Sequence, residues 1–235
     1  QKSYVAHHGA EAHGDPRAFA HVRPQRGDVV HISGNALMNE SSLAVNAFIQ
    51  QPQCRPQERE FRMVINPTNT LRLVNDQLLE NLVLTRPIWS MNRQEARTLA
   101  YRLGVTFDES ATMRVNAGFD ESMHALCEAL GETLRAPVVL RAGARGAWVR
   151  QHGKGVEHID GFPTKATHIR SAGPAHTGAL CALLAEGWDL ESSVQIANAA
   201  ASLAIEHNHA GIPFCPTYDE AAKLVSDALT APKKD

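Results

Sequence analysis

The sequence predicts an α/β fold in which a mainly parallel central sheet is flanked by helices on both faces. Two observations carry this prediction. Short apolar runs rich in valine and isoleucine, typical of buried strands, alternate with longer segments whose apolar residues recur at helical spacing. The chain has 235 residues, of which 43% are hydrophobic, so it is long enough to form one such domain around its own core.

The first half of the chain is expected to hold three strand–helix pairs. The strands are Asp28–Ser33, Arg62–Ile65 and Pro87–Met91, and the helices that follow them are Asn39–Ile49, Leu71–Leu82 and Asn92–Leu103. A polar, proline-containing loop is expected over Gln50–Glu60. The remaining segments are weaker: a short strand at Tyr4–His7, a short helix at Asp15–Val22 and an irregular stretch at Gly104–Gly118.

The second half begins with a helix over Glu121–Leu134, where apolar residues repeat at helical spacing. Further segments follow in order: the strand Pro137–Leu140, the turn Ala142–Gly146, a hairpin of Ala147–Gln151 and Val156–Ile159, and the helices Ala175–Glu186, Leu190–His207 and Tyr218–Leu229. Gly187 is placed to end the first of these closing helices, and Asp189 to cap the second.

Composition argues against several classes of protein. A net charge of −2 does not suit a nucleic-acid-binding surface, and no apolar run approaches the roughly 20 residues that a membrane span requires. Residues 1–14 are polar and rich in histidine, unlike a secretion signal. The four cysteines, Cys54, Cys127, Cys181 and Cys215, are widely spaced, which favours reduced thiols in the cytoplasm over disulfides or a zinc site.

The segment Lys165–Gly178, KATHIRSAGPAHTG, is the first candidate for a functional site. Its small residues Ser171, Ala172 and Gly173 lead directly into an apolar helix, where backbone N–H groups could cradle a phosphate. The alternative is a tight loop before a helix, with Pro174 in the first helical turn, where proline is well tolerated.

The order of these segments resembles the carboxyl half of ribokinase-type (PfkB) sugar kinases. The strand PVVL is followed by RAGARGAWV, a hairpin ending in VEHIDGFPTKA, the small-residue segment, HTGALCALLAEG and the helix QIANAAASLAIEH. Upstream, DVVHISGNAL and VINPTNTLRLV resemble the middle strands of the same family. The resemblance runs from Gly27 to the C-terminus. It implies a ribokinase-like fold that transfers phosphoryl groups to a sugar hydroxyl, with ATP and Mg²⁺ as cofactors.

In this family the loop before the closing helices reads Asp-Thr-x-Gly-Ala-Gly-Asp, forms the anion hole and supplies the catalytic Asp. Laid on this pattern without a gap, the chain places His168 on the first Asp, and Ser171, Ala172 and Gly173 on Gly-Ala-Gly. Pro174 then falls on the catalytic Asp. The frame of the loop is kept while its chemical residues are replaced.

The replacement predicts impaired catalysis. A positioned base contributes about 10²–10⁴-fold to such a reaction, and proline has neither a side-chain acceptor nor an N–H for the anion hole. Ser171 also lacks the freedom of glycine at positive φ. His176 lies two residues from Pro174, so on a helix it points in a different direction and is a poor substitute for the missing base.

Other matches imply the cofactor contacts. Asn92 and Glu95 (NRQE) lie where the family carries an Asn-x-x-Glu motif linked to Mg²⁺ and phosphate, although the same pattern is a helix capping box. Gly143 and Gly146 match the nucleotide-binding turn and could equally form a plain β-turn. Asn198 lies in the helix that borders the adenine pocket in the family, or else on a solvated helix face.

The opening of the family domain is not matched. Its strands and Gly-Gly motif hold the sugar and form a lid, but this sequence has no Gly-Gly pair, and residues 1–26 resemble a lid remnant. We therefore expect a single domain over 1–235, with 27–235 as the core that carries the nucleotide-binding half. Lost strands would leave a sheet edge exposed, which predicts a homo-oligomer or a partner at that edge.

Three functions are compatible with these features. The first is a sugar kinase impaired by Pro174, and the second is an inactive pseudokinase that binds a nucleotide or a sugar and regulates a partner. The third is an unrelated α/β binding protein. The expected ligand in the first two is a small sugar-like molecule, with no nucleic acid and no membrane involved.

Overall fold

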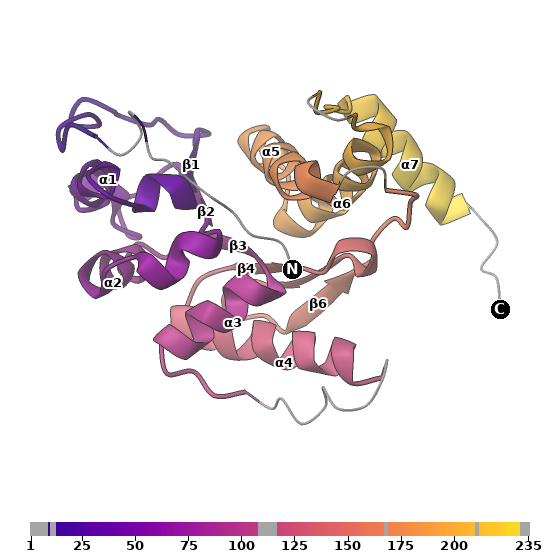
Figure 1. The fold of residues 1–235 in the computed structure, drawn as a ribbon, viewed down its shortest axis with the longest axis horizontal. Helices are drawn as coiled ribbons and strands as arrows, with labels where there is room; N and C mark the ends of the chain where they lie inside the picture. Colours follow the sequence, from indigo (N-terminus) through magenta and orange to yellow (C-terminus); the bar gives the residue numbers. More distant parts are fainter. Residues whose placement is uncertain (1–8, 10–12, 108–116, 167–168, 210–211, 231–235) are drawn as a thin grey trace.

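A computed structural model describes the chain except for residues 1–8, 10–12, 108–116, 167–168, 210–211 and 231–235. The described residues form one six-stranded sheet between two layers of helices (Figure 1). Its strands, in spatial as in chain order, are β1 (Val29–Ser33), β2 (Arg62–Asn66), β3 (Ile88–Asn92), β4 (Val138–Arg141), β5 (Ala147–Arg150) and β6 (Val156–Ile159). Strands β1 to β4 are parallel, and β5 and β6 pair antiparallel, which confirms the predicted fold class.

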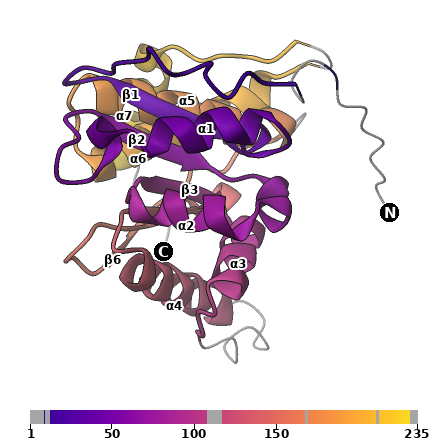
Figure 2. The same cartoon turned by 90° about the vertical axis from the view of Figure 1, so that its left-hand side faces the viewer.

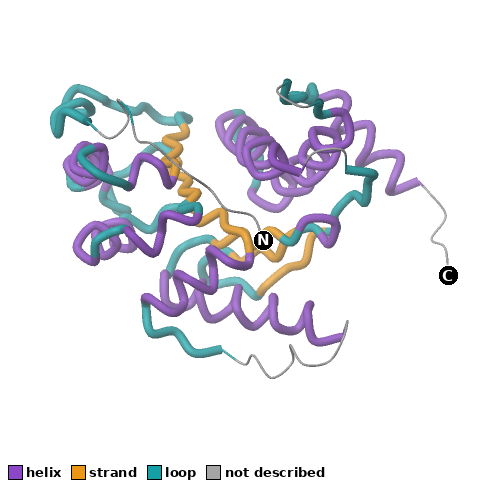
Figure 3. Tube along the Cα trace, viewed as in Figure 1, coloured by secondary structure: helices purple, strands orange, loops and turns teal. Residues whose placement is uncertain are grey.

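Helices follow the strands and fill both layers (Figure 3). They are α1 (Ser41–Ile49), α2 (Asp76–Leu84), α3 (Arg93–Arg102), α4 (Ala117–Leu134), α5 (Ala172–Ala185), α6 (Leu190–His207) and α7 (Tyr218–Thr230). Short 3₁₀ turns occupy Gly34–Leu37, Pro52–Cys54, Asn69–Leu73, Gly143–Arg145 and Ile169–Ser171. None of the described helices is both long enough and apolar enough to cross a bilayer.

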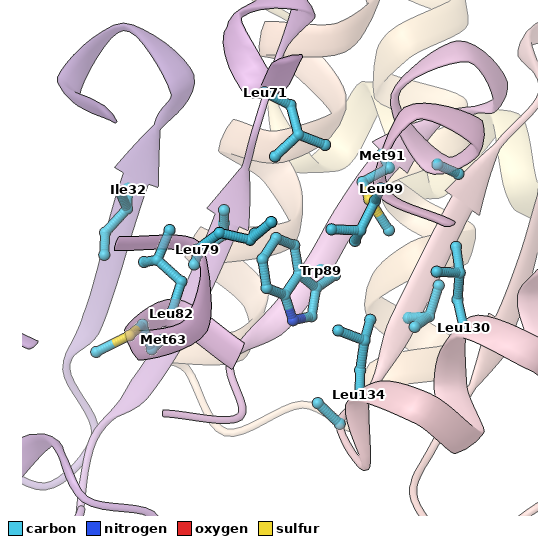
Figure 4. Packing of buried hydrophobic residues seen from close by; sticks show 14 of the residues in the cluster. Ile32, Met63, Leu71, Leu79, Leu82, Trp89, Met91, Leu99, Leu130 and Leu134 are labelled. Atoms are coloured by element: carbon cyan, nitrogen blue, oxygen red, sulfur yellow. The ribbon is translucent and has the colours of Figure 1, made fainter. Parts of the chain in front are cut away.

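The larger part of the core lies between the sheet and helices α1 to α4. Alternation along β2 sends Met63 and Ile65 to this side, where they pack with Trp89 of β3, which is fully buried (Figure 4). Helix residues such as Leu82 and Leu130 complete this cluster. Figure 2 shows α1, α2, α3 and α4 side by side along one side of the sheet.

The opposite face of the sheet is covered by α5 and α6. Val64 of β2 and Val139 of β4 point to this side and pack with Leu180 of α5 and Val194 of α6. Helix α7 then packs on α5 and α6 through Val225, so it forms an outer layer over these two helices. This second layer places the start of α5 against the parallel strands.

Several element predictions need correction. Residues 16–21 form turns, so the helix expected at Asp15–Val22 is wrong, because a stretch of about eight residues is too short to be a stable helix on its own and its Phe19 and Val22 stay exposed rather than bury a helix face. The helix expected over Leu71–Leu82 is split, since Asn75 caps a new helix through its side chain and the Leu78 N–H (2.7 Å). The expected strand Tyr4–His7 lies outside the described residues.

The segment Ser171–Gly173 is not a loop. A 3₁₀ turn ends at Ser171, and α5 begins at Ala172, three residues before the predicted start. Pro174 is therefore the third residue of the helix, where its fixed φ fits and a missing N–H breaks no intrahelical bond. The caps predicted for the next turn are confirmed: Gly187 has φ +90°, and Asp189 accepts from the Ser192 N–H at 2.8 Å.

Candidate active site

The last residues of the four parallel strands lie side by side at one edge of the sheet. Ser33 of β1 pairs in register with Asn66 of β2, and Asn92 of β3 pairs with Arg141 of β4. Because parallel strands all end at the same edge, their terminal side chains converge there. They border a cavity of about 480 Å³, lined by His31, Ser33, Asn66, Thr68, Asn92, Glu95, Arg141, Gly173, Pro174, Thr177, Gly178 and Cys181. We call it the strand-end cavity.

A second cavity of about 370 Å³ adjoins the first and shares Asn92, Arg141 and Gly173 with it. Its other lining residues come from the turn after β4, the segment after β6, and helices α5 and α6: Gly143, Ala144, Gly146, Phe162, Thr164, Ala166, Ala172, His176, Asn198, Ala201, Ser202 and Ile205. We call it the helix-side cavity. Both volumes are in the range of small-molecule sites.

The first turn of α5 forms the shared wall of the two cavities. Ala172 lines the helix-side cavity, Gly173 lines both, and Pro174 lines the strand-end cavity. The first N–H groups of a helix have no partner within the helix, so they can bind an anion, but Pro174 contributes none. Ser171 lines neither cavity, and its hydroxyl accepts a hydrogen bond from the Asn208 side chain (2.9 Å).

Asn92 and Glu95 form a complete capping box at the start of α3. The Asn92 side chain accepts from the Glu95 N–H (2.9 Å), and Glu95 Oε2 accepts from the Asn92 N–H (2.8 Å). Glu95 Oε1 also accepts from Asn92 Nδ2 (2.7 Å). The motif therefore caps α3, and the cap fixes a buried carboxylate at the wall of the strand-end cavity.

The partner of that carboxylate is Arg141. Its Nη2 lies 3.5 Å from Glu95 Oε2, and the two side chains are 15% and 8% exposed. Burial lowers the pKa of Arg141, and the negative charge of Glu95 opposes that shift, so the side chain remains a guanidinium at neutral pH.

The residues around Glu95 do not fit a divalent cation. Both of its oxygens already accept hydrogen bonds, and the positive charge of the Arg141 guanidinium lies within 3.5 Å of one of them, where it would repel a cation. Within the part of the chain that the structure describes, no group of three or more His, Cys, Asp or Glu side chains could hold a metal ion by itself. The geometry of Asn92 and Glu95 thus does not support the expected Mg²⁺ site.

The residues expected to contact the nucleotide line the helix-side cavity. Gly143 (φ +60°) and Gly146 (φ +83°) belong to the turn after β4. A Cβ on Gly146 would lie 2.0 Å from the Ile159 carbonyl oxygen, whereas one on Gly143 would meet nothing within 4 Å. Asn198 is buried and donates to the carbonyl oxygens of Ile159 (3.3 Å) and Asp160 (3.0 Å), so it is not on a solvated face.

Two further side chains at the cavities are chemically quiet. His176 is 3% exposed, and neither ring nitrogen has a hydrogen-bond partner among the described residues. Burial, reinforced by the nearby charge of Arg141 and opposed by Asn198, lowers the pKa of His176 to about 3. Burial raises the pKa of the Cys181 thiol to about 11, so it is protonated at neutral pH and a poor nucleophile.

Sequence reasoning missed several residues of the strand-end cavity. His31, Asn66, Thr68 and Arg141 were placed on strands or turns without a role. Their signal is position: Asn66, Thr68 and Arg141 lie at or just after the carboxyl ends of strands, where ligands bind in parallel sheets, and His31 lies two residues before the end of β1. Asn66 is fixed by donating to the Ser90 carbonyl oxygen (2.7 Å), which directs its own oxygen to His31 Nε2 (3.0 Å).

Comparison with known proteins gives one consistent picture. The family model described as pfkB family carbohydrate kinase matches residues 1–217. The uncharacterized sugar kinase YegV of Escherichia coli (strain K12) is 24% identical over 220 residues, which cover 94% of this chain and 61% of the relative. This chain therefore spans less than two thirds of the length of that curated relative.

Two solved structures show the same fold. Aminoimidazole riboside kinase from Salmonella enterica, complexed with aminoimidazole riboside and an ATP analog, is 16% identical with a TM-score of 0.66, over 95% of this chain and 70% of that one. Fructokinase from Vibrio cholerae O395, in its fructose, ADP and calcium ion bound form, is 18% identical with a TM-score of 0.63, over 86% of this chain and 62% of that one. The fold is ribokinase-like, and because the family model matches most of its length, this chain belongs to the pfkB family of carbohydrate kinases.

Proposed function

We propose that this chain binds ATP and a small sugar-like substrate in the two adjoining cavities, and that it transfers the phosphoryl group poorly. The observation that carries the proposal is the position of Pro174. It lies at the wall of the strand-end cavity, in the first turn of the helix whose N-terminus would face the phosphates.

The character of the two cavities favours one ligand in each. The helix-side cavity combines the glycine turn with Phe162, Ala201 and Ile205, a mixed surface that suits a flat base and its ribose. The strand-end cavity offers Ser33, Asn66 and Thr177, which suit the hydroxyl groups of a sugar. The Thr177 hydroxyl is buried and has no hydrogen-bond partner among the described residues, so a ligand could satisfy it.

Phosphoryl transfer needs a group that takes up the proton of the attacking hydroxyl. Pro174 has no acceptor, and His176, with its pKa of about 3, is a weak base at neutral pH. Glu95 is the one carboxylate among the described residues that line either cavity, and both of its oxygens are already engaged. We therefore expect slow turnover.

His31 carries the remaining basic nitrogen among the described residues that line the strand-end cavity. Since Asn66 Oδ1 only accepts, His31 Nε2 carries the hydrogen of that bond and Nδ1 keeps a free lone pair in the neutral ring. We propose that any residual transfer by the native chain depends on His31. The variant His31→Gln should then abolish the residual rate while leaving ATP binding unchanged in calorimetry.

The test of the proposal is a Pro174→Asp substitution. It restores a carboxylate at the wall of the cavity, so we expect sugar-dependent ADP release to rise by about 10²–10⁴-fold over the native chain. Pro174→Ala is the matched control, since it restores the N–H without an acceptor and should leave the rate within a few fold. ATP binding in calorimetry without any rescue would contradict the assignment of Pro174.

The second candidate is an inactive pseudokinase that binds a nucleotide or a sugar and regulates a partner. The Arg141–Glu95 contact favours it, because it engages the carboxylate that would otherwise be free for chemistry. Ligand binding with no turnover, either in the native chain or in Pro174→Asp, would support this candidate.

For both candidate functions we propose a cytoplasmic location, since all four cysteines are free thiols.

A further inference from the structure

Arg141 holds the central position in the site. It ends β4, and its side chain borders both cavities. Among the described residues that line the two cavities, no other lysine or arginine is present. The side chain is 15% exposed, so its charge is screened by little solvent. Any anionic group that spans the two cavities would therefore meet this guanidinium.

The hydrogen bonding of Arg141 is incomplete. Its Nη2 reaches Glu95 at a long 3.5 Å, and its buried Nε has no partner among the described residues. Its Nη1 faces the first turn of α5, because a Cβ added to Gly173 would lie 2.9 Å from it. A buried donor without an acceptor costs free energy, and a bound phosphate would remove that cost at the helix end that also favours anions.

The same side chain excludes a divalent cation. A cation at Glu95 would have to displace the guanidinium or lie against its positive charge, inside a poorly solvated pocket. A planar guanidinium can instead bind phosphate oxygens in a bidentate manner, which supplies both charge and direction. The charge that a metal would bring to the phosphates is already present in the protein.

We infer that Arg141 replaces the divalent cation, so that this site binds the phosphate groups of its ligand without Mg²⁺. The inference rests on the proposed function, because it concerns the same two cavities. It differs from that proposal in the group recognised: Arg141 binds a di- or triphosphate as such, whether or not a nucleoside is attached.

Calorimetry with inorganic pyrophosphate tests the inference directly. With the native chain we expect binding in excess EDTA, at an affinity within about threefold of that in excess Mg²⁺. Arg141→Met should weaken binding in EDTA at least tenfold, as expected for the loss of a charge-assisted hydrogen bond. Because Arg141→Met leaves a buried Glu95 unpaired, the double variant Arg141→Met, Glu95→Gln is measured beside it, since glutamine keeps the capping box.

Arg150→Met is the matched control. Arg150 ends the neighbouring strand β5, is 12% exposed, pairs with Glu132 at 3.4 Å and also has an Nε without a partner among the described residues, but it lines neither cavity. Its loss should leave pyrophosphate binding within twofold. This control separates a general effect of removing a buried arginine from an effect on the site.

The outcomes separate this inference from the proposed function. If pyrophosphate binds in EDTA but ATP does not bind at all, the inference stands and the proposed nucleotide site is wrong. If either ligand binds only when Mg²⁺ is present, or if the double variant binds pyrophosphate as tightly as the native chain, the inference is overturned. Absence of pyrophosphate binding in both buffers also overturns it.

Discussion

His176 is a histidine kept neutral by its surroundings. Its pKa is about 3 in the folded chain and about 6.5 in the unfolded chain. At a pH between these two values, the imidazole therefore binds a proton only in the unfolded chain. The unfolded state then holds more protons, so this residue makes the free energy of unfolding fall as pH falls below about 6.5. The slope of the unfolding free energy with pH approaches about 1.4 kcal/mol per pH unit, and the free energy stops falling near the pKa of the folded chain.

His176→Leu should remove this part of the pH dependence. Between pH 7 and pH 5 we expect the native chain to lose about 2 kcal/mol more unfolding free energy than the variant, measured by urea titration. His124→Leu, at an exposed position on α4, is the control and should follow the native curve. Equal pH dependence of His176→Leu and the native chain would show that His176 is not buried in the neutral form.

Gly143 and Gly146 make a matched pair in one turn. Both have positive φ, which costs an alanine about 1–2 kcal/mol, but only Gly146 faces backbone atoms as well, since a Cβ there would lie 2.0 Å from the Ile159 carbonyl oxygen. We expect Gly143→Ala to cost about 1 kcal/mol and Gly146→Ala at least about 3 kcal/mol of unfolding free energy. Similar costs in chemical denaturation would contradict the close approach of the two segments.

At the scale of elements, α6 is the helix that the sequence specified most completely. Its start follows from the Asp189 side chain, which accepts from the Ser192 N–H, and this hydrogen bond lowers the pKa of Asp189. Because the folded pKa is lowered, the stabilisation is present above the unfolded value of about 3.9 and is lost as pH falls through the folded one.

Asp189→Ala should therefore destabilise the chain by about 0.5–2 kcal/mol at neutral pH. The difference in unfolding free energy between the variant and the native chain should shrink in acid, because the Asp189 carboxylate of the native chain becomes protonated. Asp227→Ala, an exposed position within α7, has no cap to lose and should change the unfolding free energy by less than about 0.5 kcal/mol. An Asp189→Ala effect that stays constant with pH would argue against the cap.

At the scale of the whole molecule, β1 forms one edge of the sheet, and no described strand pairs with its outer side. Such an edge presents free N–H and C=O groups to another chain. We expect this chain to self-associate or to bind a partner there, so sedimentation velocity should show species larger than the monomer at micromolar concentrations. A monodisperse monomer across a wide concentration range would contradict this prediction.

A pair of proline variants locates the contact. The Arg62 N–H donates to the Asp28 carbonyl oxygen (2.9 Å), so by alternation the Val29 N–H points away from β2 and the Val30 N–H points toward it. Val29→Pro should weaken self-association with little loss of stability, since proline is tolerated at the start of an edge strand. Val30→Pro should destabilise the fold instead, because it removes a hydrogen bond of the ladder.

Much of the candidate site was predictable because it depends on local sequence. The capping box of Asn92 and Glu95, and the order of small residues before α5, are patterns that neighbouring residues define. The role of Arg141 was not predictable in this way. It follows from the contact with Glu95, which lies 46 positions earlier in the chain.

Local patterns in the chain were enough to specify the α/β class, the order of strands and helices, the caps of α3 and α6, and the lack of a carboxylate at position 174. These features depend on periodicity and on contacts within a few residues. The meeting of Arg141, Glu95 and the first turn of α5 at the wall shared by two cavities could be seen only in the folded chain. It arises because parallel strands bring their carboxyl ends to one edge of the sheet, where residues far apart in the sequence become neighbours.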